Sequence, residues 1–265
     1  MLLALIETCT NSHELAILLK ILRGVLWRNA LNLFDMNRLK GYEVVASFLQ
    51  RRADLVNGPV VDELLHIAGF RQTSQSANGL LANAEACRHL ILDIRIWRGV
   101  ATVDSAKVLQ GLQGLLASAP ADGLPSRLER RDLNASVLES IGIVAFLCFY
   151  MHEPHVVEET CRHVVGTLER FLAVAPLHLQ HLHMLAQLLL TGNPFAGSTG
   201  GGSPQPLCPR VSSSGVLAMQ LISMLTCMLF RLVQAADAQR LQVLCTAFEP
   251  VWFAIMFQQA RSPEI

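Results

Sequence analysis

The densest group of possible metal ligands and proton carriers surrounds a proline near the middle of the chain. It consists of His152, His155, Glu158, Glu159, Cys161 and His163. A helical zinc site needs donors four residues apart, as in H-E-x-x-H, so that both side chains reach one ion. His152 and His155 instead flank Pro154 at the start of a predicted helix, where the glutamates suit the positive end of the helix dipole. The spacing therefore predicts no metal site and no cofactor.

A glycine-rich stretch, Gly197 to Ser203, has part of the spacing of a phosphate-binding loop. Such a loop requires G-x-x-x-x-G-K-[ST], in which the lysine reaches the phosphates. Gly197 and Gly202 have the required separation, but Ser203 occupies the lysine position. The composition is instead typical of a flexible linker.

No arrangement for nucleophilic catalysis can be recognised. There is no G-x-S-x-G motif, and Cys87 and His89 are two residues apart on a predicted helix, so they cannot face each other. At 100° per residue His178 and His181 lie about 60° apart, and His183 points away from His181. The sequence therefore favours a protein that is not an enzyme. The alternative is a part of an enzyme or transporter whose site is not visible.

Composition and charge restrict the partners and the cellular compartment to be expected. Apolar residues make up 52% of the 265 residues, charged residues make up 16%, and the formal net charge is zero. The few basic pairs, such as Arg51-Arg52 and Arg130-Arg131, lack aromatic interleaving, so nucleic acid is not an expected partner. The seven cysteines lie mostly in apolar helical runs, and we expect buried free thiols in a reducing compartment, the cytoplasm.

Two apolar runs raise the question of a membrane span. Ile141 to Met151 is shorter than the roughly 20 residues that cross a bilayer, and Gly215 to Phe230 is interrupted by polar side chains. We expect both to be core helices, and Leu133 to Met151 to form one central helix.

Helical signals recur about every 20 residues. A capping residue at Asn11 or Ser12 precedes a helix over Leu15 to Phe34, and the stripe Leu39, Tyr42, Ala46 and Leu49 follows. Further helices are predicted over Val60 to Ala68, after a cap at Asn83 through Trp97, over Asp104 to Ala117, after Pro154 and after Pro176.

This alternation of helices and short breaks predicts an all-α fold, an armadillo-like α-solenoid of antiparallel helix pairs. Residues 1–190 are expected to form the main helical region. Residues 191–215, rich in Gly, Ser and Pro, are expected to be a flexible linker or loop, and 216–265 a further helical pair that continues the solenoid.

Part of the chain resembles a known family. The segments M-N-R-L-K-G-Y-E-V-V-A-S-F-L-Q-R-R-A-D-L, D-E-L-L-H-I-A-G-F and H-L-I-L-D-I-R-I-W-R resemble the armadillo-like region of the large BEACH-domain proteins. That family includes the neurobeachin-like, lysosomal trafficking regulator and autophagy-linked FYVE proteins. No BEACH domain, pleckstrin-like module, WD repeat or FYVE finger is recognisable here, and the chain looks like part of a longer protein.

The resemblance implies a cytosolic scaffold in vesicle traffic, lysosome-related organelles or selective autophagy. Its partners would be trafficking proteins, with indirect association to endosomal or lysosomal membranes through other modules. The residues expected to matter are structural anchors. Gly41 would permit close helix approach, Tyr42 would anchor a helix pair, and Asp93 would form hydrogen bonds near a buried Trp97.

Overall fold

The computed structural model describes residues 1–70, 81–117, 125–151, 158–191 and 215–247. Within these ranges the regular structure is entirely helical, without a strand, so the all-α prediction is confirmed. The chain divides into two compact units, Met1–Phe146 and Leu147–Ile265. Each unit is considered separately below.

The first unit contains most of the helices. In order along the chain they are α1 (Leu2–Glu7), α2 (Ser12–Leu26), α3 (Ala30–Arg38), α4 (Gly41–Arg51), a 3₁₀ turn (Ala53–Leu55), α5 (Gly58–Ala68), α6 (Ala84–Ala86), a π-helical turn (Cys87–Ile91), α7 (Ile94–Trp97), α8 (Thr102–Leu116) and α9 (Pro125–Ser140). The helix α10 (Ile143–Met151) begins in this unit and ends in the next.

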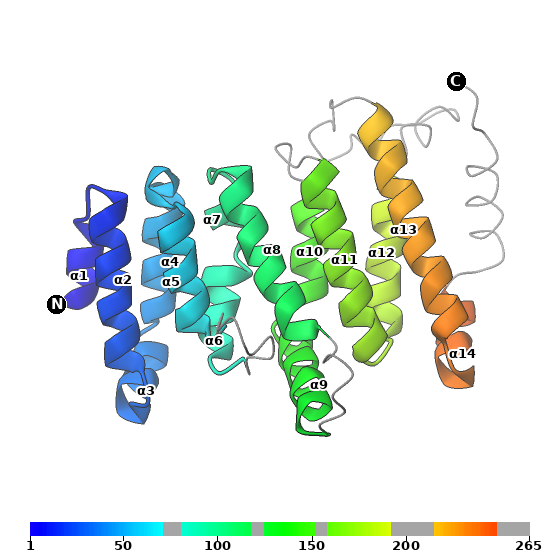
Figure 1. Ribbon diagram of the computed structural model, residues 1–265, viewed down its shortest axis with the longest axis horizontal. Coiled ribbons are helices and arrows are strands. Elements are labelled where there is room, and N and C mark those ends of the chain that lie inside the picture. Colours follow the sequence, from blue (N-terminus) through cyan, green and yellow to red (C-terminus); the bar gives the residue numbers. More distant parts are fainter. Residues whose placement is uncertain (71–80, 118–124, 152–157, 192–214, 248–265) are drawn as a thin grey trace, which may run out of the picture. The chain divides into compact units, whose positions relative to one another are not determined.

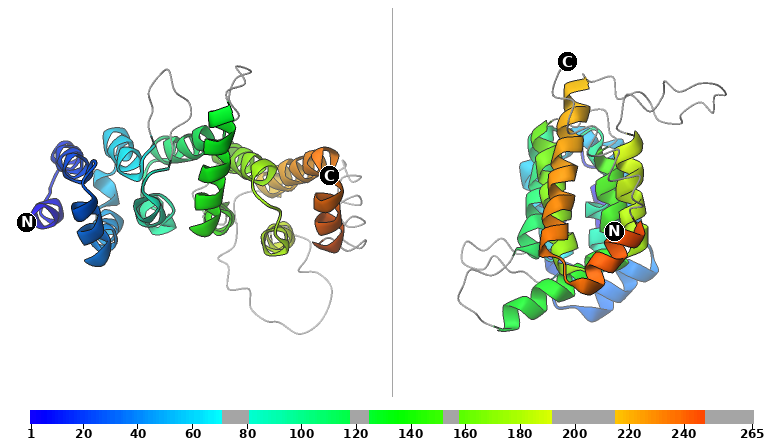
Figure 2. Two further views of the ribbon diagram at one scale, coloured as in Figure 1. Left: turned by 90° about the horizontal axis from the view of Figure 1, so that it is seen from below. Right: turned by 90° about the vertical axis from the view of Figure 1, so that its right-hand side faces the viewer.

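The helices of the first unit pack in two rows. In one row α2 packs on α5 and α5 packs on α8; in the other α1 packs on α4 and α4 packs on α7 (Figure 1). The view from below separates the same two rows (Figure 2). Much of the packing in this unit is therefore between helices that are not consecutive in the chain.

The second unit repeats this arrangement on a smaller scale. It contains α11 (Glu158–Val174), α12 (Leu179–Thr191), α13 (Gly215–Ala235) and α14 (Ala238–Ala247). In this unit α11 packs on α13 and α12 packs on α14. Helix α11 lies after Pro154, where a helix was predicted, and its buried side chains include Val164, Leu168 and Phe171.

Asparagine side chains begin many of the helices. The Oδ1 atoms of Asn11, Asn29, Asn57 and Asn83 each accept a hydrogen bond from the backbone N–H three residues later. These bonds satisfy donors that a helix N-terminus otherwise leaves without a partner. The cap predicted at Asn11 or Ser12 is at Asn11, and the predicted cap at Asn83 is confirmed.

The single helix predicted over Leu15 to Phe34 is wrong. Helix α2 ends at Leu26, and Arg28 has a left-handed backbone with φ of 53°. Asn29 caps α3, and the Nδ2 atom of Asn32 donates to the Val25 carbonyl oxygen at 2.8 Å. Asn29 thus accepts a hydrogen bond from a free N–H group at the start of α3, and Asn32 donates one to a carbonyl oxygen at the end of α2. These bonds stabilise the break, although the apolar periodicity continues across it.

The single central helix predicted over Leu133 to Met151 is also wrong. The chain bends by 69° between Arg131–Ser140 and Ile143–Met151, and Gly142 between them has φ of 86°. A glycine adopts this conformation without steric penalty. Among the described residues no single helix is long and apolar enough to cross a membrane, although this bent pair reaches that length and composition together.

Two smaller expectations need correction. The helix predicted from Asn83 to Trp97 is divided into α6, the π-helical turn and α7, because Asp93 caps a new helix start. Leu39, predicted on the stripe of Tyr42, Ala46 and Leu49, precedes α4 and is exposed, whereas the other three side chains are buried.

Several expectations fall on residues outside the described part of the chain. The linker predicted over 191–215 does so except for Thr191, which ends α12, and Gly215, which begins α13. His152, His155 and the glycine-rich stretch 197–203 also lie there. The three predicted regions, 1–190, 191–215 and 216–265, therefore stay predictions.

Candidate functional site

The four residues expected to be anchors all lie in the first unit, on α4 or on the segment from α6 to α7. Gly41 begins α4, where a Cβ would collide with the sulfur of Met36. The absence of a side chain at Gly41 therefore leaves room for Met36 of α3 to lie against the start of α4.

Tyr42 is buried and fastens the beginning of α4 to the beginning of α6. Its hydroxyl oxygen accepts a hydrogen bond of 2.6 Å from Nδ2 of Asn83. The same Nδ2 atom lies 3.4 Å from the carbonyl oxygen of Ile67, and Oδ1 of Asn83 caps α6. Burial raises the pKa of Tyr42, an effect that the hydrogen bond from Asn83 partly opposes.

Asp93 links the C-terminal end of α4 to the start of α7. Its Oδ2 atom accepts a hydrogen bond of 2.8 Å from Nε2 of Gln50, and its Oδ1 atom accepts the backbone N–H of Arg95 at the start of α7. The carboxylate also pairs with the Arg95 guanidinium at 2.7 Å, which raises the pKa of Arg95. Asp93 thus acts as a helix cap and as a bridge between helices. The bridging partner Gln50 carried no signal in the sequence.

Trp97 lies at the end of α7 with 1% of its surface exposed. Its Nε1 atom donates a hydrogen bond of 2.8 Å to the carbonyl oxygen of Ile91, the last residue of the π-helical turn. Asp93 lies between these two residues in sequence, but its own partners are Gln50 and Arg95. The ring fills the core while its polar atom has a partner, as buried indoles usually require.

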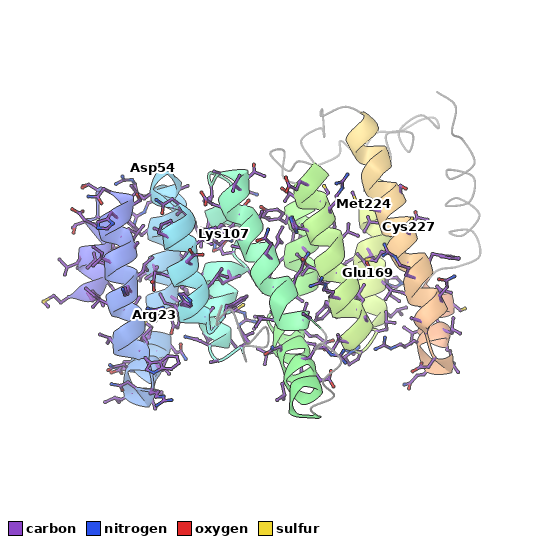
Figure 3. The ribbon with its side chains drawn as sticks, viewed as in Figure 1. Arg23, Asp54, Lys107, Glu169, Met224 and Cys227 are labelled. Carbon is purple, nitrogen blue, oxygen red and sulfur yellow. The ribbon has the colours of Figure 1, made fainter. Side chains whose placement is uncertain are left out.

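Ion pairs connect successive helices of a row. Arg23 of α2 pairs with Glu63 of α5 at 3.3 Å, and Asp62 of α5 pairs with Lys107 of α8 at 3.5 Å. In the second unit Glu169 of α11 pairs with Arg231 of α13 at 3.2 Å. Figure 3 labels Arg23, Lys107 and Glu169 on their helices. Each of these pairs links two helices that pack against each other within one unit.

Most of the described thiols lie in the helical core. Cys9, Cys87, Cys148 and Cys161 are buried, as expected, but the expectation is wrong for Cys227 and Cys245, which are exposed. Burial raises the pKa of Cys87 well above its usual range and that of Cys148 to about 12. Buried thiols of this kind stay protonated at neutral pH and are inert.

The described histidines do not form a metal site. No group of three or more His, Cys, Asp or Glu side chains in the described part of the chain could hold an ion. The rings of His178 and His181 meet edge to face with centroids 5.4 Å apart, and His181 also contacts Phe171. The ring of His181 thus takes part in aromatic packing.

Several large apolar side chains of α2 and α3 in the first unit are exposed. We call Ile17, Ile21 and Val25 the α2 stripe; their exposed fractions are 45%, 48% and 46%. On α3, Leu31 and Phe34 are 68% and 61% exposed. Clusters of large exposed apolar side chains mark protein interaction sites more often than single ones do. The signal in the sequence was a second apolar stripe on α2, four residues apart and away from the buried Leu15, Leu19, Leu22 and Leu26.

Comparison with known proteins finds distant relatives. The chain is 25% identical over 167 residues, 63% of its length, to human WD repeat- and FYVE domain-containing protein 4. It is 21% identical to the mouse protein of the same name over an alignment of 277 positions that covers 99% of this chain. The chain spans only 5% and 8% of the length of these relatives. No family model and no solved structure matches it.

Proposed function

We propose that this chain is a non-catalytic helical scaffold segment of a BEACH-type protein that acts in vesicle trafficking, lysosome-related organelles or selective autophagy. The observation that carries the proposal is the similarity to WD repeat- and FYVE domain-containing protein 4, which extends over 63% of the chain. The scaffold role is consistent with the apolar surface of α2 and α3.

We further propose that the helices form an armadillo-like α-solenoid. Within each unit a helix packs on another further along the chain, α2 on α5 and α5 on α8 in one case and α11 on α13 in the other. Repeat folds of this kind consist of helix pairs stacked one after another, so that the helices form two rows. An extended solenoid surface binds protein partners without an enclosed pocket.

The proposed partners are proteins of membrane traffic, and the proposed location is the cytoplasm, with peripheral association to endosomal or lysosomal membranes through modules outside this chain. Leu31 and Phe34 of α3 are the residues we assign to partner contact, because both are large, apolar and more than half exposed. No role in catalysis is assigned to any residue.

Proximity labelling in living cells tests this function. The full chain, fused to a labelling enzyme, should enrich tethering, coat and lysosomal or autophagic proteins over the unfused enzyme. The double variant Leu31→Glu/Phe34→Glu should fold but lose that enrichment. Val103→Glu is the matched control, since Val103 is an exposed apolar residue at the start of α8. A set of neighbours without trafficking proteins, or turnover of a small substrate by the purified chain, would overturn the proposal.

A further inference from the structure

Helix α5 shows how a helix inside a row meets its neighbours. It packs on both α2 and α8, and an ion pair crosses each contact. Glu63 of α5 pairs with Arg23 of α2, and Asp62 of α5 pairs with Lys107 of α8. The contact between α11 and α13 in the second unit also carries an ion pair. Contacts between helices of a row thus combine apolar packing with a pair of opposite charges.

Helix α2 is the first helix of its row and leaves one side exposed (Figure 1). Its buried side carries Leu15, Leu19, Leu22 and Leu26. At 100° per residue, the side opposite to these leucines is centred between Ile17 and Gly24, and Lys20 and Ile21 flank that centre. Ile17 and Ile21 are 45% and 48% exposed, although α2 also contacts α1 and α3. We call Ile17, Lys20, Ile21 and Gly24 the open side of α2.

Gly24 leaves room for another helix near the centre of the open side. Among the described residues, nothing lies within 4 Å of the position that a Cβ at Gly24 would occupy. A glycine inside a helix lowers its stability relative to alanine, and its lack of a side chain allows another backbone to come close. Since no described atom uses the space, the position is open to the close approach of a second helix.

The charge of the open side favours an acidic partner. From Leu15 to Phe34 the chain carries Lys20, Arg23 and Arg28 but no acidic residue. Arg23 already takes part in the contact with α5, whereas Lys20 is exposed and has no ion-pair partner among the described residues. Glu14, in the first turn of α2, is the nearest acidic residue before this stretch. A carboxylate on an incoming helix would therefore give Lys20 the kind of partner that the other row contacts have.

We propose that the open side of α2 is a docking surface for an acidic amphipathic helix of a partner protein. Apolar side chains of that helix pack on Ile17 and Ile21, its backbone passes close to Gly24, and one of its carboxylates pairs with Lys20. A helix fits this surface because α5 receives helices from both of its neighbours, and because apolar anchors about one turn apart recognise amphipathic helices. The surface lies on α2 rather than on α3, so this proposal stands independently of the trafficking function.

Binding of synthetic peptides tests the charge of the partner. The first peptide is a helix of about 15 residues, the length at which isolated helices become stable, with leucine along one face and glutamate on the other. The second peptide has lysine in place of each glutamate. In fluorescence anisotropy the wild-type chain should bind the glutamate peptide roughly tenfold more tightly than the lysine peptide. Equal affinities, or no binding of the glutamate peptide, overturn the proposal.

Substitutions on α2 test the location of the surface. Ile21→Glu should weaken binding of the glutamate peptide roughly tenfold or more, because it places a carboxylate against the glutamates. Gly24→Leu should also weaken binding, because its side chain fills the space at the centre of the open side, although leucine favours a helix more than glycine does. Val103→Glu is the matched control and should leave the affinity unchanged. Unchanged affinity in folded Ile21→Glu and Gly24→Leu variants overturns the proposal.

Charge exchange at Lys20 tests the ion pair. Lys20→Glu should weaken binding of the glutamate peptide about 2- to 5-fold, the range for an exposed ion pair, and should strengthen binding of the lysine peptide. Lys40→Glu changes the net charge equally at an exposed residue before α4 and should do neither. Equal effects of the two variants would show that only net charge matters and would overturn the pairing at Lys20.

Two further measurements test other occupants of the same surface. The wild-type chain should stay monomeric in sedimentation at the concentrations used for peptide binding. It should also fail to sediment with vesicles of phosphatidylserine and phosphatidylcholine. Dimerisation that Ile21→Glu abolishes would assign the open side to a second copy, and vesicle binding that Ile21→Glu abolishes would assign it to a membrane surface. Either result overturns the proposal.

Discussion

The indole Nε1 atom of Trp97 donates a 2.8 Å hydrogen bond to the carbonyl oxygen of Ile91, six residues earlier in the chain. Ile91 ends the π-helical turn, and Trp97 ends α7. This bond closes the short segment between the two helices into a compact loop around Asp93. The carboxylate of Asp93 then attaches the same segment to Gln50 of α4.

Truncation of Trp97 should therefore unfold the first unit readily. Trp97→Ala is expected to lower the free energy of unfolding by about 3–5 kcal/mol, the range for a buried aromatic side chain. Trp97→Phe keeps most of the apolar contact but leaves the Ile91 oxygen without its partner, and should lose about 1–3 kcal/mol. Urea unfolding measures both, and an unchanged midpoint for Trp97→Ala would show that the ring is not an anchor.

Removal of the Asp93 carboxylate should destabilise the same unit to a smaller degree. Asp93→Ala loses the cap of α7 and the bond from Gln50, which together should cost about 1–3 kcal/mol. Asp93→Ser keeps a helix cap but loses the bond from Gln50, so its stability should lie between those of the wild type and Asp93→Ala. Asp35→Ala removes an exposed carboxylate paired with Arg38 and should change stability by less than about 1 kcal/mol. Equal effects at Asp93 and Asp35 would contradict the bridging role.

The thiols should divide into two reactivity classes. With Cys208 replaced by serine, Cys227 and Cys245 should react quickly with a thiol reagent in the native protein, because both are exposed. The buried Cys9, Cys87, Cys148 and Cys161 should react only on unfolding. Rapid labelling of Cys87 under native conditions would show that the core around the π-helical turn opens easily.

The buried thiols should also make stability depend on alkaline pH. Burial raises the pKa of Cys148 to about 12, whereas an unfolded thiol titrates near about 8.5. Between these two pKa values the native thiol keeps its proton while the unfolded thiol releases it, so rising pH favours the unfolded state. The stability that the protonated Cys148 contributes is therefore fully present below the unfolded pKa and is lost as the pH rises toward 12. Unfolding midpoints measured across this range should fall less steeply for Cys148→Ala than for the wild type.

Arg240 should stabilise the second unit by capping α11. Its guanidinium donates to the carbonyl oxygens of Leu172, Ala173 and Ala175. Arg240→Ala should lose about 1–2 kcal/mol and increase hydrogen exchange in the last turn of α11. Arg231→Ala removes a more exposed ion pair with Glu169 and should lose less than about 1 kcal/mol. Unchanged exchange in α11 after Arg240→Ala would contradict the cap.

Two glycine substitutions should have opposite effects. Gly142→Ala should destabilise by about 1–2 kcal/mol, since φ of 86° disfavours any side chain. Gly114→Ala in α8 should stabilise by about 0.5–1 kcal/mol, because a Cβ there meets none of the described atoms within 4 Å. Thermal melts compare the two. Stabilisation by Gly142→Ala would show that the bend between α9 and α10 does not need glycine.

Much of the local structure could be predicted from residue patterns. A cap at Asn11 or Ser12, a cap at Asn83 and a helix that ends at Ala68 all follow from preferences of single residues. The structure has the first cap at Asn11 and confirms the other two. The breaks at Arg28 and Gly142 could not be predicted from apolar periodicity, because that periodicity continues through both. The break at Arg28 depends on hydrogen bonds that the Asn29 side chain accepts and the Asn32 side chain donates. The break at Gly142 depends on the backbone freedom of that glycine.

The sequence by itself determined that this protein is helical, where most helices begin and that no catalytic motif is recognisable. Only the tertiary structure decided which apolar stripes are covered. Leu19 and Ile21 lie on the same helix and are similarly apolar, yet Leu19 is fully buried and Ile21 is 48% exposed. Periodicity reports that a helix has an apolar face, but burial depends on whether another helix packs against it, and that is a property of contacts between residues distant in sequence.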